Sequence, residues 1–345
     1  MIRISDIAED VGVSRSLVSK VLSGRMGRST VRPELAAKIQ SRARELGYVP
    51  NVSARALFSG RQSAIGVFIS RHGQPGSGLV EAFIDGVADE LAKSRQRMIL
   101  QFFHDEAGFD DCLAVAHLSV LDGVVVAGGL YFDILPKIRT IRERGVPVAS
   151  MFDVPIAPDV SNAGIDQTEV GYVATRHLVE CGCRRPAFIR IARPEINLRF
   201  AGYRRALDEA GIAFSQDRIC TLRTYEIAKL PAQIEALVRS GVPFDGIVAE
   251  SDRQSATVLR TLLAAGIHVP RDVKVIGIDD SPVCGFTTIP LSSVSGQDRR
   301  RAALAVRLLI EEIDGKLPRH VLTPPIVSAR ESTATSDRPF ADSQF

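Results

Sequence analysis

Short apolar segments recur along the chain from Ser63 onward, and each is followed by a stretch that is polar or has helical periodicity. Buried parallel strands are continuous apolar runs in a sequence, because helices cover both faces of such a sheet. This alternation therefore predicts an α/β fold with parallel sheets. The runs are AIGVFI (64–69), RMILQFF (97–103), DGVVVA (122–127), VPVASMF (146–152), RPAFIRI (185–191), DGIVAE (245–250) and VKVIGID (273–279).

An internal repeat divides these runs into two groups. DGVVVA at Asp122 and DGIVA at Asp245 are each followed by a helix-like stretch, and then by GVP at Gly145 or GIHVP at Gly266. The repeat predicts two similar, doubly wound lobes within residues 63–335. Ligands of such sheets bind beyond the carboxyl ends of the strands, so we expect a ligand site between the lobes.

The N-terminal segment DIAEDVGVSRSLVSKVLSG, from Asp6 to Gly24, has a different pattern. Its apolar residues are spaced for two short helices, and Gly12 between them can adopt the left-handed conformation that ends a helix. Ser14 can accept a hydrogen bond from a free amide of the second helix. A third helix is predicted from Pro33 to about Leu46, with Gly47 as its stop.

The positive charge of the chain is concentrated at this end. Residues 1–61 carry a net charge of +6, whereas the remainder carries −3. A basic module of two short helices joined by a turn is typical of helix-turn-helix DNA binding, in which the second helix enters the major groove. On that helix, Arg15 and Ser16 suit contacts to base edges, and Ser19 and Lys20 suit contacts to phosphates.

Composition limits the other classes of protein. No apolar run is long enough to span a membrane, and acidic residues occupy the N-terminus where a signal peptide would be basic and then apolar, so we expect a cytoplasmic protein. The odd number of cysteines fits reduced thiols, and we expect neither a metal nor a cofactor. The cysteines are Cys112, Cys181, Cys183, Cys220 and Cys284.

Three quoted segments together resemble the LacI/GalR family of bacterial transcription regulators. They are DIAEDVGVSRSLVSKVLSG, ARELGYVPN (43–51) and ARALFSGRQSAIGVFIS (54–70), and a looser likeness continues to about residue 332. The resemblance implies an all-α helix-turn-helix headpiece followed by an α/β body of two lobes, like that of periplasmic binding proteins. The loop GRMGRSTVR is longer than the family's, and Arg32 stands where a capping serine is usual.

The headpiece (1–49) and the body (63–335) are joined by a predicted linker (50–62), and a polar tail (336–345) follows. The linker segment NVSARALFSG is too short to form a stable helix alone. The resemblance implies that it becomes a hinge helix on operator DNA, with Leu57 as a minor-groove wedge. Asn51 and Ala54 are the other hinge residues that we assign to DNA contact.

Polar residues at strand ends are candidates for a ligand site, since carboxylates and guanidinium groups suit a hydroxyl-rich ligand. The resemblance matches Arg199 and Asp279 to effector-contacting positions of the family, and Asp153 and Ser251 to less constant ones. We interpret Asp252 and Asp280 as capping or loop-bracing acids. The predicted effector-binding residues are Ser70, Arg71, Asp153, Arg199, Ser251 and Asp279.

Two other functions share this body. The segment GQPGSG (73–78) between a strand and a helix, with Asp105 after the next strand, has some likeness to a nucleotide-binding turn of an enzyme. A periplasmic sugar-binding protein would have the same lobes but an export signal in place of the basic headpiece. We therefore predict a non-enzymatic regulator, most simply a repressor, that binds double-stranded operator DNA and a small molecule such as a sugar or sugar derivative. The C-terminal segment lacks a leucine heptad, which favours a homodimer.

Overall fold

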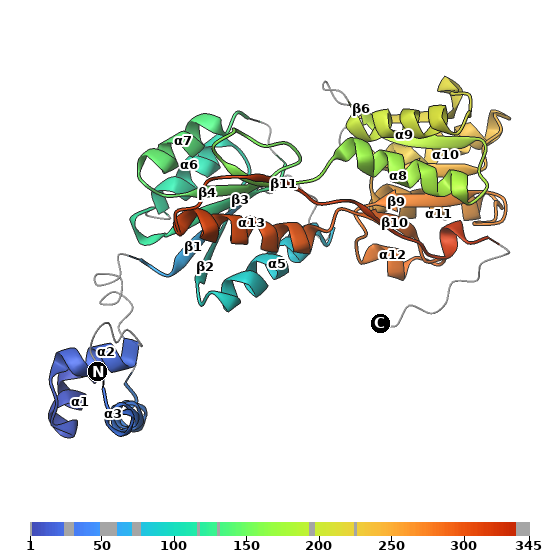
Figure 1. Ribbon diagram of the computed structural model, residues 1–345. Helices are drawn as coiled ribbons and strands as arrows, with labels where there is room; N and C mark the ends of the chain where they lie inside the picture. The colour runs from blue at the N-terminus through green and yellow to red at the C-terminus, as the bar shows by residue number, and fades with distance from the viewer. Residues whose placement is uncertain are drawn as a thin grey trace. The chain divides into compact units, whose positions relative to one another are not determined.

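The computed structural model describes residues 2–23, 31–48, 61–70, 77–115, 118–129, 132–192, 197–223 and 226–335 (Figure 1). The chain forms two compact units, residues 1–62 and residues 63–345. Within the described part of the chain, no helix has the length and apolar character needed to cross a membrane.

The first unit is a bundle of three helices: α1 (Ile4–Val11), α2 (Arg15–Ser23) and α3 (Pro33–Glu45). Gly12 ends α1 with a φ of 75°, and the Ser14 hydroxyl accepts a hydrogen bond from the Leu17 amide at 3.2 Å, both as predicted. Gly47 follows α3 with a φ of 63°. The shared core contains Ile7, Ala8, Val18, Val21, Ile39 and Ala43, so each helix contributes one apolar face.

The second unit contains two sheets, and the first has the strand order β11-β5-β4-β3-β1-β2 with all pairs parallel. Alternate residues of β1 face opposite sides: Phe68 packs with α6 and α7, whereas Val67 packs with α5 and α13. Helices therefore cover both faces, as the apolar runs predict. The elements are β1 (Ala64–Ser70), α5 (Leu79–Lys93), β2 (Arg97–Phe103), α6 (Glu106–Val115), β3 (Gly123–Ala127), α7 (Leu135–Glu143), β4 (Val148–Met151), β5 (Ser161–Gly164), α13 (Asp298–Ile313) and β11 (His320–Leu322).

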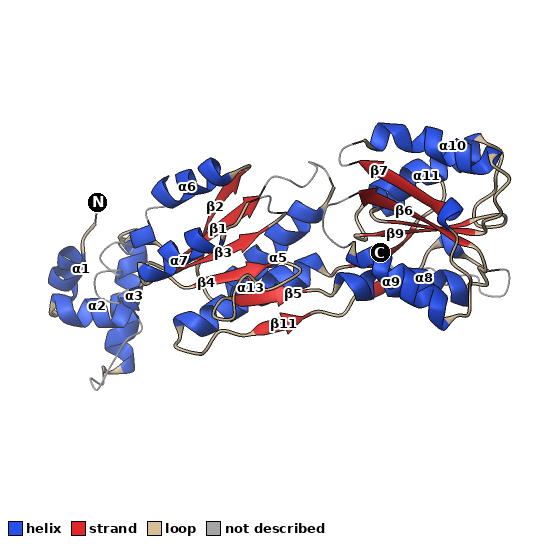
Figure 2. Cartoon of the chain, turned by 90° about the horizontal axis from the view of Figure 1, so that it is seen from above, coloured by secondary structure: helices blue, strands red, loops and turns tan. Residues whose placement is uncertain are grey.

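The second sheet repeats this order as β12-β10-β9-β8-β6-β7, with only β12 antiparallel to its neighbour. Figure 2 shows the strands of the first sheet side by side, from β2 to β11. Its elements are α8 (Gln167–Glu180), β6 (Pro186–Ala192), α9 (Leu198–Glu209), β7 (Ile219–Arg223), α10 (Leu230–Arg239), β8 (Gly246–Ala249), α11 (Asp252–Ala264), β9 (Lys274–Ile278), α12 (Val283–Phe286), β10 (Ser292–Ser295) and β12 (Ile326–Ser328). Short 3-10 turns occur at Leu118–Val120, Gln216–Arg218, Ile227–Lys229 and Glu331–Thr333.

The internal repeat has the same local structure in both lobes. The Asp122 carboxylate accepts a hydrogen bond from the Ser63 amide at 2.7 Å, just before β1. The Asp245 carboxylate accepts bonds from the amides of Arg184 and Arg185 at 2.9 and 2.8 Å, just before β6. Each aspartate thus ties the start of the third strand of its lobe to the start of the first. The two doubly wound lobes predicted from the sequence are confirmed.

The chain crosses between the two sheets three times, after β5, after β10 and between β11 and β12. As a result, α13 follows β10 of the second sheet in sequence but packs beside α5 on the first sheet (Figure 1). Residues next to these crossings lie at the boundary between the lobes.

Helices α8 and α9 pack closely at two glycines. A Cβ atom at Gly171 would lie 1.9 Å from the Arg199 carbonyl oxygen, and one at Gly202 would lie 2.0 Å from the Thr168 carbonyl oxygen. No side chain fits at these distances from a backbone atom, so glycine is required at both positions. The contact places the first turn of α9 against the first turn of α8.

We expect Gly171→Ala to lower the free energy of unfolding of the second unit by at least about 2 kcal/mol, because an added methyl group forces the two backbones apart. Urea denaturation measures this change. Gly285→Ala is the matched control, since a Cβ atom there meets nothing within 4 Å. Equal stability of the two variants would contradict the close packing of α8 and α9.

Candidate DNA-binding helix and ligand site

The exposed face of α2 carries the residues predicted to contact DNA. Arg15 and Ser16 are exposed, and Ser19 and Lys20 are partly exposed. Val18 and Val21 lie on the opposite face and are buried in the three-helix core. The helical geometry thus brings the four predicted residues onto one surface, and their contact with DNA stays a prediction.

Three acidic residues of the three-helix unit, Asp6, Asp10 and Glu45, interact with residues outside α2. The Asp10 carboxylate on α1 pairs with Arg42 on α3, and Arg42 also pairs with Glu45 at 3.0 Å. The Asp6 carboxylate accepts a hydrogen bond from the Arg3 amide at 2.8 Å, which lowers the pKa of Asp6. Arg15 makes no ion pair with another described residue. Arg15 therefore places an exposed positive charge on α2.

Four predicted contact residues fall outside the described part of the chain. They are Asn51, Ala54 and Leu57 of the hinge segment and Arg71 after β1. Their assignments stay predictions from the sequence.

The candidate ligand site is built around Arg199, in the first turn of α9. Its Nε donates a hydrogen bond to the side-chain oxygen of Gln167 at 2.6 Å, and its Nη1 donates to the Glu250 carbonyl oxygen. Asn197 caps α9 by accepting from the Phe200 amide at 3.0 Å, which fixes the start of the helix. The guanidinium is therefore held at the carboxyl ends of the second sheet.

Asp153 contributes to the site from the first lobe. It follows β4, and the neighbouring residue Phe152 is held by the buried Asn162 side chain, which bonds both backbone groups of Phe152 at 3.0 and 3.1 Å. The Asp153 carboxylate accepts a hydrogen bond from the side-chain nitrogen (Nε2) of Gln167 at 2.9 Å. It also lies 3.8 Å from the Arg301 guanidinium. Its side chain is 51% exposed, so it remains accessible to a ligand.

Asp279 lies at the end of β9 in a strained backbone conformation. Its φ is 116°, which is rare for a residue with a side chain and is often found at functional sites. Its surface is partly exposed, but its carboxyl group is surrounded by protein. This burial is the main reason that the pKa of Asp279 is raised to about 8. The positive charge of Arg199 lowers the pKa, and the nearby carboxylates of Asp252, Asp298 and Asp153 raise it further.

Two further charged residues support this group from α13. Arg301 is buried, pairs with Asp298 at 3.3 Å and donates a hydrogen bond to the Ala163 carbonyl oxygen at 3.3 Å. Burial lowers the pKa of Arg301 and raises the pKa of Asp298. Arg301 also lies 3.8 Å from the Asp153 carboxylate, so the pair contributes one positive and one negative group next to this residue.

The two acids interpreted as bracing residues have that role. The Asp252 carboxylate accepts hydrogen bonds from the Ser281 amide at 2.6 Å and from the Ser293 hydroxyl, and burial raises its pKa. Asp280 pairs with Arg330 at 2.8 Å and accepts from the Ser328 hydroxyl at 2.7 Å. Both acids thus hold the loop after β9 against neighbouring strands.

The two predicted serines make internal hydrogen bonds. The Ser251 hydroxyl caps α11 by accepting from the Gln254 amide at 3.3 Å. The Ser70 hydroxyl is almost completely buried and donates to the Gly129 carbonyl oxygen at 2.5 Å. Their assignment to effector binding is not tested by these contacts and stays a prediction.

Four residues of this candidate site are not among those predicted from the sequence: Gln167, Glu250, Asp298 and Arg301. Glu250 follows β8 directly and accepts hydrogen bonds from the Ile191 amide at 2.6 Å and from the Asn197 side chain. It could have been found as a polar residue at a strand end. Gln167, Asp298 and Arg301 lie in or near the start of a helix that follows a crossing between the sheets, and no pattern in the sequence marks these crossings.

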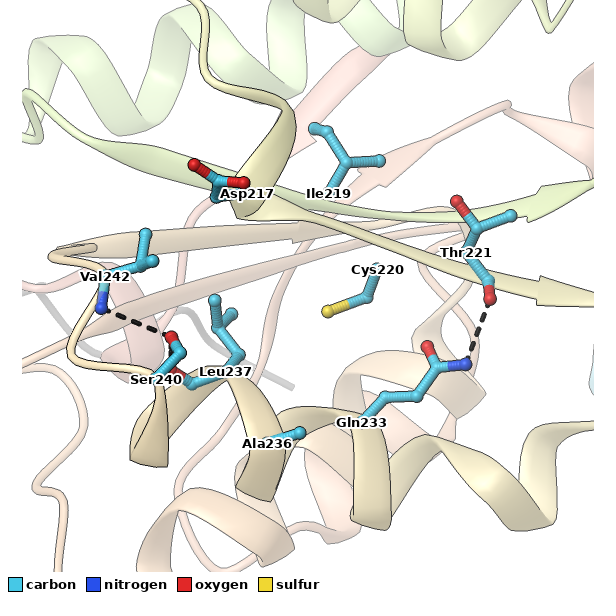
Figure 3. Close-up of a pocket in the computed structure, with 9 residues that line it drawn as sticks. All are labelled: Asp217, Ile219, Cys220, Thr221, Gln233, Ala236, Leu237, Ser240 and Val242. Carbon is cyan, nitrogen blue, oxygen red and sulfur yellow. Dashed lines mark hydrogen bonds between the residues drawn. The ribbon is translucent and has the colours of Figure 1, made fainter.

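A separate hollow of about 400 Å³ lies between β7 and α10, away from Arg199 and Asp279 (Figure 3). Its lining includes Cys220, Thr221 and Gln233. The side-chain nitrogen of Gln233 donates a hydrogen bond to the Thr221 carbonyl oxygen at 3.0 Å. None of the predicted effector-binding residues lines it. Among the described residues, no group of three His, Cys, Asp or Glu side chains is placed to hold a metal ion.

Two family models match separate parts of the chain. The model of bacterial regulatory proteins of the LacI family matches residues 3–51, and the model of the periplasmic binding protein-like domain matches residues 175–333. The first match covers the three-helix unit, and the second covers all six strands of the second sheet and α13.

Curated relatives match nearly the full length. The HTH-type transcriptional regulator CelR of Thermobifida fusca is 30% identical over 90% of this chain and 91% of its own length. The HTH-type transcriptional regulator GntR of Pseudomonas aeruginosa is 28% identical over 91% of this chain and 90% of its own length.

Solved structures have the same architecture. The complex of the transcriptional regulator CelR with cellobiose has a TM-score of 0.68 at 27% identity, covering 96% of this chain and 100% of that one. The lac repressor dimer bound to operator has a TM-score of 0.76, covering 97% of this chain and 99% of that one, and at 19% identity it supports the fold alone.

Asp279→Asn is expected to raise the melting temperature more at about pH 8.5 than at about pH 5, by about 2–4 °C at the higher pH. Because the pKa of Asp279 is raised in the folded state, ionisation destabilises the fold progressively as pH rises towards 8. Asparagine removes this ionisation. Thermal melts at both pH values measure the effect.

Asp208→Asn serves as the control, since Asp208 is an exposed acid on α9. A gain for Asp279→Asn that is the same at both pH values would show that this carboxyl group is not the one that titrates.

Proposed function

Because the chain belongs to the LacI family of bacterial regulatory proteins, we infer that it regulates transcription by binding a specific DNA sequence. The observation that carries this inference is the presence, in one chain, of a basic helix-turn-helix unit and a two-lobed α/β body. We propose a repressor of the cytoplasm that performs no catalysis, since the family consists of transcription regulators. A nucleotide-dependent enzyme or a free sugar-binding protein would have no use for the cationic surface of α2.

In the proposed mechanism, α2 enters the major groove of operator DNA. Arg15 and Ser16 at its N-terminal end read base edges, while Ser19 and Lys20 contact phosphates. Two copies of the chain bind as a homodimer to a palindromic operator, one headpiece to each half-site. The hinge residues Asn51, Ala54 and Leu57 form a helix on the DNA, and Leu57 inserts into the minor groove.

The small-molecule site controls this binding. We assign Arg199, Asp279 and Asp153 to direct contacts with the effector, and Ser70, Arg71 and Ser251 to the border of the site. The cellobiose bound by CelR supports a sugar or sugar derivative as the effector of this chain as well. A ligand that changes the lobe spacing by engaging both sides of the site alters operator affinity about 5- to 150-fold if the coupling is roughly 1–3 kcal/mol.

Arg15→Ala tests the role of the second helix. We expect it to weaken binding to an operator selected from random duplexes by about 5- to 150-fold, because a lost base contact costs roughly 1–3 kcal/mol. Binding to unrelated duplex DNA should change much less. Fluorescence anisotropy with labelled duplexes measures both affinities.

Arg44→Ala is the charge-matched control, since Arg44 is an exposed arginine on α3. Equal loss in both variants, or equal loss on specific and unrelated DNA, would place the base-reading surface elsewhere.

Arg199→Ala tests the small-molecule site. Neutral mono- and disaccharides, cellobiose included, are first screened for stabilisation of the full chain, since a ligand at one hundred times its Kd adds about 2.7 kcal/mol of stability. We expect Arg199→Ala to abolish this stabilisation and the change in operator affinity, while ligand-free operator binding is kept. A response retained by the variant would move the effector away from Arg199.

A further inference from the structure

The side chain of Gln167 joins the two lobes at the ligand site. Its oxygen accepts a hydrogen bond from Arg199 Nε at 2.6 Å, and its nitrogen donates to Asp153 Oδ1 at 2.9 Å. Arg199 belongs to the second lobe through α9, whereas Asp153 follows β4 of the first lobe. The side-chain amide of Gln167 therefore forms hydrogen bonds with both Arg199 and Asp153, the two residues that we assign to effector contact.

The chemistry of the two partners fixes the orientation of this amide. Arg199 Nε can only donate, and the Asp153 carboxylate can only accept when it is ionised. With its oxygen and nitrogen exchanged, Gln167 would place a donor against a donor and an acceptor against an acceptor. The amide group thus matches this pair of partners in one orientation only.

The second-lobe side of this bridge is rigid. Asp166 caps α8 by accepting from the amides of Thr168 and Glu169 at 2.8 and 3.2 Å, so the helix begins at a fixed residue. Gly171 allows α8 to contact α9 at the Arg199 carbonyl oxygen. Gln167 and Arg199 therefore move together with the second lobe.

The first-lobe side is held separately. Arg301 on α13 lies 3.8 Å from the Asp153 carboxylate and bonds the Ala163 carbonyl oxygen of β5. Asn162 fixes the backbone of Phe152 next to Asp153. The link from Gln167 to Asp153 is therefore a contact between two separately braced bodies.

We propose that Gln167 is a positioning residue that couples Arg199 to Asp153 across the lobe boundary and holds the ligand-free body in one lobe arrangement. This inference rests on the proposed function, in which both residues contact the effector. Two adjacent hydroxyl groups can replace the amide, one donating to Asp153 and the other accepting from Arg199. Such a ligand takes over the bonds of Gln167 and releases the lobes to a new spacing.

A phosphate or carboxylate group lacks this match. It accepts from Arg199 but offers no donor to Asp153, so it would place negative charge against a carboxylate. The bridge therefore favours a neutral vicinal diol over an anionic group at this position of the site.

The test measures lobe separation in the ligand-free, full-length chain. Fluorophores are attached at Arg139→Cys on α7 and Arg239→Cys on α10, two exposed positions on different lobes. Cys181→Ser removes the one native cysteine that is not buried. Single-molecule energy transfer then gives the distribution of distances between the labels.

We expect Gln167→Ala to reduce the population at the wild-type separation by about half or more. Gln167→Glu should have a similar effect, because its carboxylate keeps the bond to Arg199 but repels Asp153. Gln216→Ala, at an exposed glutamine of the second lobe, is the matched control and should change nothing.

An unchanged distribution in Gln167→Ala, or a change equal to that of Gln216→Ala, would overturn the proposed coupling. Circular dichroism at the measuring temperature establishes that each variant is folded. If Arg199→Ala abolishes a sugar response while Gln167→Ala leaves the distribution of label distances unchanged, the proposed coupling through Gln167 fails and the proposed function stands. If Gln167→Ala alters the lobes but the chain binds no operator, the bridge is supported and the proposed function fails.

Discussion

The close contact between α8 and α9 is the constraint on which the candidate ligand site depends. Ordinary helix pairs pack with their axes 8–10 Å apart, because side chains separate the backbones. Gly171 and Gly202 remove that separation, and a Cβ atom at either position would lie within 2.0 Å of a carbonyl oxygen. The first turns of the two helices are thereby aligned. The hydrogen bond of 2.6 Å from Arg199 Nε to the side-chain oxygen of Gln167 depends on this alignment. It would be lost if the helices moved apart.

Burying the carboxyl group of Asp279 costs free energy and does not contribute to the stability of the fold. A residue with a side chain at a φ of 116° is strained, and a carboxyl group whose pKa is raised to about 8 is poorly solvated. Nearby acids add to this cost, and the Arg199 guanidinium offsets part of it. Such a combination is typical of a binding site, because a ligand that donates hydrogen bonds to Asp279 relieves the unfavourable environment.

The sequence predicts the parts of the fold in which burial requires apolar residues. Strands β1 and β3 are covered on both faces, so their residues are apolar apart from Ser70 at the end of β1, and the three headpiece helices each show one apolar face. Strands β5 and β10 could not be found in this way, since their sequences are SNAG and SSVS. Asn162 of β5 is nevertheless buried, because its side chain satisfies the backbone groups of Phe152. Such compensation depends on a tertiary partner and leaves no periodic pattern in the sequence.

The same distinction applies to the ligand site. Asp153, Arg199 and Asp279 could be proposed because parallel strands place their carboxyl ends at one edge, whereas Gln167 and Arg301 lie beside crossings whose location depends on both lobes. The polar character of these crossings has a physical reason. Each of the four apolar clusters of the second unit lies within one lobe. An apolar boundary would add about 25 cal/mol for each Å² buried and favour one closed arrangement. Hydrogen bonds contribute only about 0.5–1.5 kcal/mol net, since water or a ligand can replace them. A boundary made of amide, carboxylate and guanidinium groups can therefore exchange its partners for those of an effector, which a regulator with movable lobes requires.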